Sequence, residues 1–259
     1  MNNYTATTNT QGQIIVKKQT SVLNKALLVA GAAFILLFLF SYSLFQLLSK
    51  YLHNPSSGVL NGLYAISVIG IIVVIIMSIV VSAKLPTIKI STIIWMIALY
   101  TIFNGIMFGI LFYSIQNSVG TNFNVKDILY CFLITGAIFT ISGLVGSILS
   151  VRFTLSLGRF LMIATFALMI FMFFFWIISL FAFHHNFEKT NMIILFVWGL
   201  LMLGYIAFDI SVIKKSDSFA QILDSQTQTK FVFLFGFMLL VDLINMLWIV
   251  IRLYIAFKR

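Results

Sequence analysis

The sequence predicts an all-α membrane protein with seven transmembrane helices. Hydrophobic residues make up 61% of the chain and charged residues only 8%, whereas soluble domains average about 25% charged residues. The apolar runs are also continuous over about 20 residues, the length that a helix needs to cross a bilayer. Strands of a membrane barrel would instead alternate apolar and polar positions, so helices are the spanning elements that fit.

The apolar runs divide the chain into two parts. Residues 1–25 are rich in Thr, Asn and Gln, and they predict a polar, disordered cytoplasmic tail. Residues 26–259 form the predicted seven-helix transmembrane domain. Its spans lie at about 26–48, 59–83, 92–115, 128–150, 160–183, 192–213 and 231–251.

The distribution of Lys and Arg predicts the orientation. The tail and the second, fourth and sixth loops hold ten basic residues, whereas the first, third and fifth loops hold three. The positive-inside rule therefore places the N-terminus in the cytoplasm. The basic residues are spread thinly between spans, which favours contact with the lipid bilayer over nucleic acid. Seven full crossings would leave Arg252, Lys258 and Arg259 outside, but we still expect the last helix to span fully.

The fourth span carries small residues on one helical face. Their spacing of three and four would let a neighbouring backbone approach closely, which predicts helix packing rather than a pore lining. The residues are Gly136, Thr140, Gly143, Ser147 and Ser150.

Two of the six carboxylates lie inside predicted spans, Asp209 in the sixth and Asp242 in the seventh. A charged group at bilayer depth costs from ~2.5 to more than ~10 kcal/mol, so such an acid needs compensation and often has a function. The alternative without a function is a buried acid that is protonated, or paired with a base, for structural reasons alone. The other four carboxylates fall in predicted loops, where we expect ordinary solvated side chains: Asp127, Glu188, Asp217 and Asp224.

The sixth and seventh spans are consecutive and can pack as an antiparallel pair. The predicted helix ends leave the two carboxylates about 10 Å apart along the bundle at 1.5 Å per residue, which tilt and side-chain reach would have to close. If Asp209 and Asp242 meet, they cannot both ionise cheaply, so they would share a proton and titrate as a coupled pair. When ionised, they would offer hard oxygen ligands to a calcium ion.

Polar residues continue beyond Asp242 along the last span. Asn245 and Arg252 give that helix one polar flank, and Arg252 can either pair with a carboxylate or extend to the membrane interface. The chain has no metalloprotease, phosphate-loop or nucleophile-elbow motif and no Cys/His ligand spacing. We therefore expect no enzymatic activity and no cofactor.

Three segments of the chain resemble the Bax inhibitor-1 (transmembrane Bax inhibitor motif) family. The segment GYIAFDISVIKK, which contains Asp209, resembles the end of that family's sixth helix. The segment LLVDLINMLWIVIRLY resembles its final-helix signature at Asp242, Ile244, Asn245 and Arg252. The segment TGAIFTISGLVGSILSVRFTLSLGRFL resembles its fourth helix and the following loop, with Thr154 in place of an acid. The chain is thus similar to a divergent bacterial member.

The resemblance implies a seven-helix fold in which the last helix is central. It also implies a pH-sensitive calcium leak governed by Asp209 and Asp242. A basic residue at the cytoplasmic end of the second helix would latch the sixth-helix aspartate, and the nearest candidates for this latch are Lys84 and Lys89.

Together these observations predict a calcium-permeable leak channel in a bacterial cell membrane, gated by protonation of the aspartate pair. Calcium is the transported ion and not a bound cofactor. One alternative is a regulatory membrane protein that binds a partner such as a membrane protease through its polar tail. A weaker alternative is a proton-coupled transporter of an organic solute.

Overall fold

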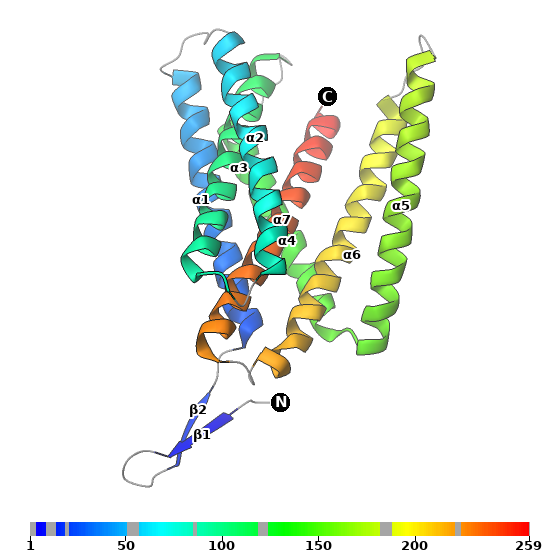
Figure 1. The fold of residues 1–259 in the computed structure, drawn as a ribbon. Helices are drawn as coiled ribbons and strands as arrows, with labels where there is room; N and C mark the ends of the chain where they lie inside the picture. Colours follow the sequence, from blue (N-terminus) through cyan, green and yellow to red (C-terminus); the bar gives the residue numbers. More distant parts are fainter. Residues whose placement is uncertain are drawn as a thin grey trace.

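The computed structural model contains a bundle of seven long helices and a short two-stranded ribbon (Figure 1). It describes residues 4–8, 14–18, 21–50, 57–84, 87–118, 124–181, 188–220 and 224–258. All seven helices are long and apolar enough to cross a membrane. The prediction of an all-α, multi-pass membrane protein is therefore confirmed. The helices are α1 (Val22–Lys50), α2 (Ser57–Ala83), α3 (Ile90–Ser118), α4 (Val125–Ile148), α5 (Val151–Phe181), α6 (Glu188–Ala220) and α7 (Ser225–Lys258).

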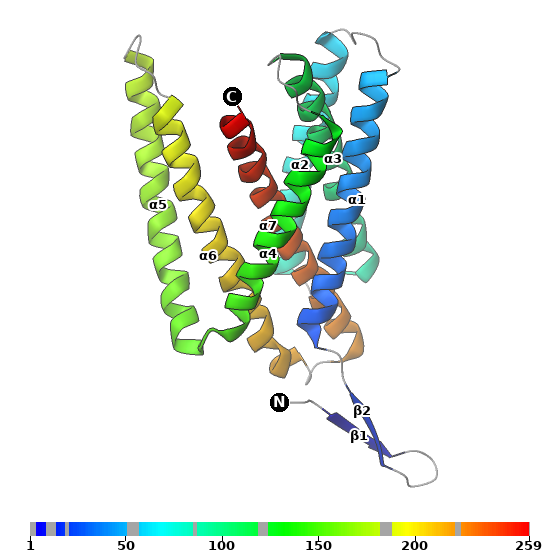
Figure 2. The same cartoon turned by 180° about the vertical axis from the view of Figure 1, so that it is seen from behind.

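Helix α7 is the centre of the bundle, as predicted. It packs against α1, α3, α4 and α6, while α2 lies on α3 and α5 lies on α6 (Figures 1 and 2). Within the most apolar 18-residue stretch of each helix, the buried share is 72% in α7 but only 6% in α5. The other helices therefore surround α7, whereas α5 presents nearly all of its surface to lipid.

Helix α7 crosses the whole bundle. It begins near the start of α1 and ends near the start of α4, so the described ends of the chain lie at opposite faces (Figure 1). The predicted apolar span of 231–251 is extended by polar turns at both ends, to Ser225 and Lys258. The 34 residues of α7 are therefore long enough for the expected full crossing.

The predicted tail contains regular structure within its described residues. Strands β1 (Tyr4–Thr8) and β2 (Ile14–Lys18) pair antiparallel, with Tyr4 opposite Lys18 and Thr8 opposite Ile14. The Thr residues of β1 and the Ile and Val residues of β2 are β-branched, and such residues favour extended backbone. Composition alone favoured disorder because these residues are polar on average. The ribbon extends away from the end of the bundle at which α1 begins (Figure 1).

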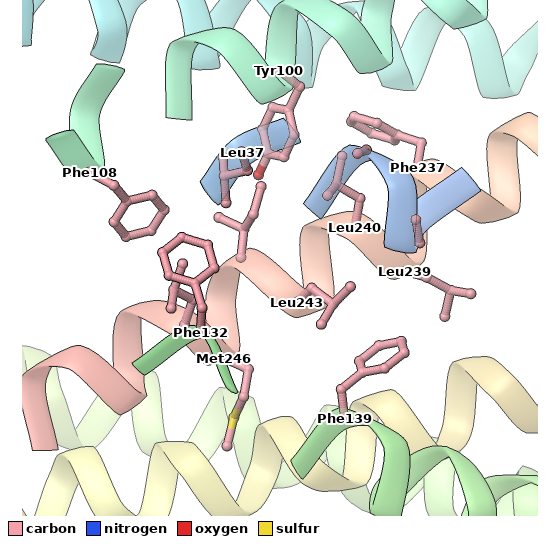
Figure 3. Close-up of a cluster of buried hydrophobic side chains, with 14 of the residues drawn as sticks. Leu37, Tyr100, Phe108, Phe132, Phe139, Phe237, Leu239, Leu240, Leu243 and Met246 are labelled. Carbon is pink, nitrogen blue, oxygen red and sulfur yellow. The ribbon is translucent and has the colours of Figure 1, made fainter. Parts of the chain in front are cut away.

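Large side chains from three helices converge on α7 in the core. Figure 3 shows Leu37 of α1, Tyr100 and Phe108 of α3, and Phe132 and Phe139 of α4 around the α7 residues Phe237, Leu239, Leu240, Leu243 and Met246. The ring of Tyr100 meets that of Phe237 edge-on at 5.2 Å between centroids. Lipid tails are as apolar as these side chains, so close packing rather than release from water holds the helices together.

Two acids that we expected in solvated loops cap the N-terminal ends of helices. The backbone N–H of Val22 at the start of α1 donates to Oδ1 of Asp217 at 2.7 Å, and Asp217 itself lies in the last part of α6. Asp224 caps α7 by accepting the N–H of Thr227 at 3.0 Å. Hydrogen bonds from Thr227 lower the pKa of Asp224 below its usual value. Both acids are helix caps because α6 and α7 extend into the segment predicted as a loop.

Helix α4 approaches α6 most closely at Gly146. A Cβ atom at this position would lie 2.2 Å from the carbonyl oxygen of Ala207, and one at Gly143 would lie 2.7 Å from Cδ1 of Ile210. The predicted packing face is therefore used at its C-terminal half. In the N-terminal half of this face, a Cβ atom at Gly136 would meet only open space.

Replacing Gly146 with Ala should separate α4 from α6, because the added methyl group meets rigid backbone. We expect the substitution Gly146→Ala to lower the free energy of unfolding by about 1–3 kcal/mol. Thermal unfolding in detergent measures the change. The matched control is Gly136→Ala on the same helix, which should leave stability unchanged or slightly increased. Equal effects of the two substitutions would contradict the close contact.

Candidate functional site: a buried aspartate pair between α6 and α7

The structure brings Asp209 and Asp242 together. Asp209 lies well inside α6, which continues to Ala220, and Asp242 lies near the middle of α7. Their carboxyl groups are within hydrogen-bonding reach of each other. Asp242 is only 7% exposed and Asp209 is half-buried. The two carboxyl groups therefore meet despite an axial offset of about 9 Å, which the observed helix ends still give at 1.5 Å per residue.

One oxygen of this pair lacks a donor. Oδ2 of Asp242 is buried and accepts no hydrogen bond from any described residue. Two ionised carboxylates cannot bond to each other, because neither carries a hydrogen. A proton on either acid supplies the missing donor and removes the repulsion between the two charges. The observed contact is therefore the arrangement expected of a pair that holds one proton.

Two polar residues of α3 stand on the other side of α7. Tyr100 lies within electrostatic range of Asp242, and its side chain interacts with that of Asn104. The Asn104 amide also donates to the backbone carbonyl of Tyr100 at 2.8 Å. Both residues are nearly fully buried. Sequence analysis did not single them out, although an asparagine within the third span was a detectable signal.

The supporting residues predicted on α7 do not join the pair. Asn245 and Arg252 are both exposed. Arg252 pairs with no carboxylate in the described part of the chain, and its guanidinium carbon lies 5.6 Å from the centroid of the Trp248 ring. Of the two expectations for Arg252, pairing with an acid is therefore not observed among the described residues.

The predicted latch is not engaged in this structure. Lys84 and Lys89 lie at the turn between α2 and α3, and both are exposed. Across the described residues, the only ion pair joins Lys258 to Asp127. Among the residues that the structure describes, no basic side chain forms an ion pair with Asp209.

The pair alone is too small to hold a resident metal ion. Among the described residues, no three or more Asp, Glu, His or Cys side chains are grouped in a way that could bind one. Two carboxylates supply at most four oxygens, whereas calcium takes 6–8. The arrangement suits a cation that passes and keeps part of its water shell better than one that is stored.

A second polar cluster joins the end of α6 to the turn between α4 and α5. Nζ of Lys215 donates to Oγ of Ser211 at 2.8 Å, to the carbonyl oxygen of Ser150 at 3.1 Å and to Oγ1 of Thr154. Nζ of Lys214 donates to the carbonyl oxygen of Ser147 at 2.7 Å. These lysines satisfy carbonyl groups at the C-terminal end of α4, where a positive charge is also favoured by the helix dipole.

Asp127 is the acid whose environment was predicted wrongly. We expected a solvated loop residue, but it lies in the first turn of α4 and is only 5% exposed. Its Oδ1 accepts the hydroxyl of Tyr254 at 2.5 Å, and its Oδ2 is 2.5 Å from Nζ of Lys258. Oδ2 also accepts the N–H of Asn124 at 2.6 Å. The last turns of α7, which are far away in sequence, bury this acid.

We call the contact of Asp127 with Tyr254 and Lys258 the terminal clasp. It fixes the end of α7 to the start of α4. It also neutralises Lys258, one of the basic residues whose predicted position outside the cell conflicts with the positive-inside rule. Charge-assisted bonds to a buried acid are stronger than surface ion pairs. The clasp therefore holds one end of α7, whereas the aspartate pair joins its middle to α6.

Comparisons with models of known protein families, with curated proteins and with solved structures each gave no match.

Removing the carboxylate of the clasp should free the end of α7. We expect Asp127→Ala to lower the free energy of unfolding by about 2–3 kcal/mol, because Lys258 and Tyr254 both lose their acceptor. Hydrogen exchange followed by mass spectrometry should show faster amide exchange in the last turns of α7.

The neighbouring exposed cation provides the control for this experiment. Lys126→Ala changes a side chain next to Asp127 without touching the clasp, so exchange at the end of α7 should stay slow. Unchanged exchange in Asp127→Ala would show that the clasp does not hold the helix.

Proposed function

We propose that this chain is a divergent Bax inhibitor-1-type protein that forms a pH-sensitive, calcium-permeable leak. We place it in a bacterial cell membrane with its N-terminus in the cytoplasm. The observation that carries the proposal is the contact between Asp209 and Asp242 in the interior of the bundle, with one carboxylate oxygen left without a donor. The resemblance of the segments around both acids to the family's last two helices supports the same assignment.

The proton on the pair is the proposed gate. With the proton in place, the two acids bond and hold α6 against the middle of α7. Without it, two negative charges face each other in surroundings that solvate them poorly, and they repel. The repulsion favours separation of α6 from α7 and entry of water. The clasp meanwhile keeps the end of α7 attached to α4, so the movement is confined to the contact with α6.

Deprotonation also makes the site attractive to cations. Two carboxylates provide hard oxygen ligands, which suit calcium. Because they cannot replace its whole water shell, binding would be weak enough for release, as permeation requires. Calcium is accordingly the proposed cargo.

The orientation is proposed from charge. The described ends of the chain lie at opposite faces of the bundle, and ten basic residues belong to the tail and to the loops on its side. The positive-inside rule supports a cytoplasmic N-terminus. The ion pair of Lys258 with Asp127 reduces the positive charge at the opposite face, where basic residues conflict with this rule.

Calcium flux into liposomes containing the purified protein tests the gate. We expect the flux to rise several-fold from mildly acidic to mildly alkaline pH, because proton loss adds charge and opens the pair. Asp209→Asn and Asp242→Asn should each remove most of this pH dependence. Asp224→Asn is the matched control, because it removes an exposed carboxylate and keeps a side chain that caps helices well.

Unchanged flux in both pair variants at every pH would remove the two acids from the mechanism. A saturable organic substrate that shows counterflow would instead favour a proton-coupled transporter.

A second candidate function is regulation of a partner such as a membrane protease. The observation that favours it is the ribbon formed by β1 and β2, which extends away from the bundle (Figure 1). A two-stranded sheet has two unpaired edges, and an extended segment of a partner can add to such an edge.

Deleting residues 2–20 separates the two candidate functions. The deletion removes the ribbon but keeps Ser21, whose Oγ accepts the N–H of Asn24 at 3.2 Å and caps α1. Under the leak proposal, liposome flux and its pH dependence stay unchanged. Loss of flux in a protein that remains folded would contradict the assignment of the gate to the bundle alone.

A further inference from the structure

A cavity of about 310 Å³ lies between α2, α3 and α7, away from the aspartate pair. Its lining includes the polar residues Tyr64, Ser114 and Arg252 and the apolar residues Ile110, Leu111 and Ile255. Tyr64 is 48% exposed and Arg252 is also exposed, so the cavity opens to the outside of the bundle. This volume falls at the lower end of the range for small-molecule sites.

Arg252 has no acidic partner in this cavity. Among the described residues, the only ion pair is that of Lys258 with Asp127. The Trp248 ring lies under the guanidinium, with 5.6 Å between Cζ and the ring centroid. Stacking occupies the face of a guanidinium and leaves the N–H groups at its edge available. The edge of a guanidinium matches the oxygens of a phosphate or carboxylate and binds them in a bidentate manner.

The cavity lies near one end of the bundle. Arg252 and Ser114 precede the ends of α7 and α3, and Tyr64 follows the start of α2, all at the same face of the bundle. At 1.5 Å per residue they lie about 6–10 Å inside the helix ends. The 34 residues of α7 span about 51 Å, whereas the hydrocarbon core is about 30 Å thick. Even with some tilt, the end of α7 reaches the headgroup region.

We propose that this cavity binds the phosphate group of a membrane phospholipid. Arg252 pairs with the phosphate oxygens, the hydroxyls of Tyr64 and Ser114 donate hydrogen bonds, and an acyl chain lies against the apolar wall. Charge complementarity and depth together favour this ligand over a soluble anion. The site is distinct from the proposed ion gate, because neither Asp209 nor Asp242 lines the cavity.

The test is lipid-dependent thermal stability of the purified protein in detergent. Phosphatidylglycerol should raise the unfolding temperature of the wild type. Diacylglycerol with the same acyl chains should raise it much less, because it lacks the phosphate. Arg252→Gln should weaken the apparent affinity for phosphatidylglycerol at least about tenfold, and Arg252→Lys should weaken it less.

Two further variants make the result interpretable. Arg159→Gln removes an exposed arginine of α5 from the other end of the bundle, so it should bind phosphatidylglycerol as the wild type does. Ser114→Phe fills the cavity while keeping Arg252, so it should also lose the lipid effect even if Arg252→Gln does not fold.

Three results would overturn the proposal. One is equal stabilisation of the wild type, Arg252→Gln and Ser114→Phe by phosphatidylglycerol. Another is equal stabilisation of the wild type by diacylglycerol and phosphatidylglycerol, which would show that acyl chains alone bind. A third is binding of soluble glycerol phosphate as tight as that of the lipid, which would assign the cavity to free anions.

Discussion

The burial of one carboxyl group in the middle of a transmembrane helix is the constraint on which the structure depends. Asp242 is 7% exposed, and one of its oxygens has no donor among the described residues. An acid in this position must find a proton or a partner, because lipid offers neither. The surrounding helices keep acyl chains away from it, and α6 supplies a second acid. An apolar residue could fill the same space without this cost, which supports the proposal that the acid has a function.

The remaining polar contacts determine which parts of α7 can move. Asp224 caps its first turn, and the terminal clasp ties its last turns to α4. Helix α4 also approaches α6 closely at Gly146. It therefore contacts both helices that carry the acids, α6 and α7. Helix α7 is thus held at its ends, whereas its contact with α6 combines apolar packing with the aspartate pair, whose strength we propose to depend on a proton. A pair whose strength changes with protonation is a two-state element that a pH change can bias.

Hydropathy was sufficient to predict the fold but not the ends of its helices. The apolar runs predicted seven spans, while α6 continues through polar residues to Ala220 because helix propensity does not require apolar side chains. That extension does not explain why Asp209 and Asp242 meet, because α7 also begins six residues earlier than predicted and their axial offset stays at about 9 Å. Asp127 was missed because its partners, Tyr254 and Lys258, are distant in sequence and only tertiary packing reveals them. The pairing of β1 with β2 was missed because average composition conceals a local preference for extended backbone.

The most direct test of the account measures the proton itself. Infrared difference spectroscopy of the protein in bilayers, recorded during a pH titration, detects the carbonyl stretch of a protonated carboxyl group shielded from water. The account predicts one such titrating band that both Asp209→Asn and Asp242→Asn remove or shift, since the two acids share the proton. A band that responds to only one substitution, or the absence of any such band, would contradict a shared proton at the centre of the bundle.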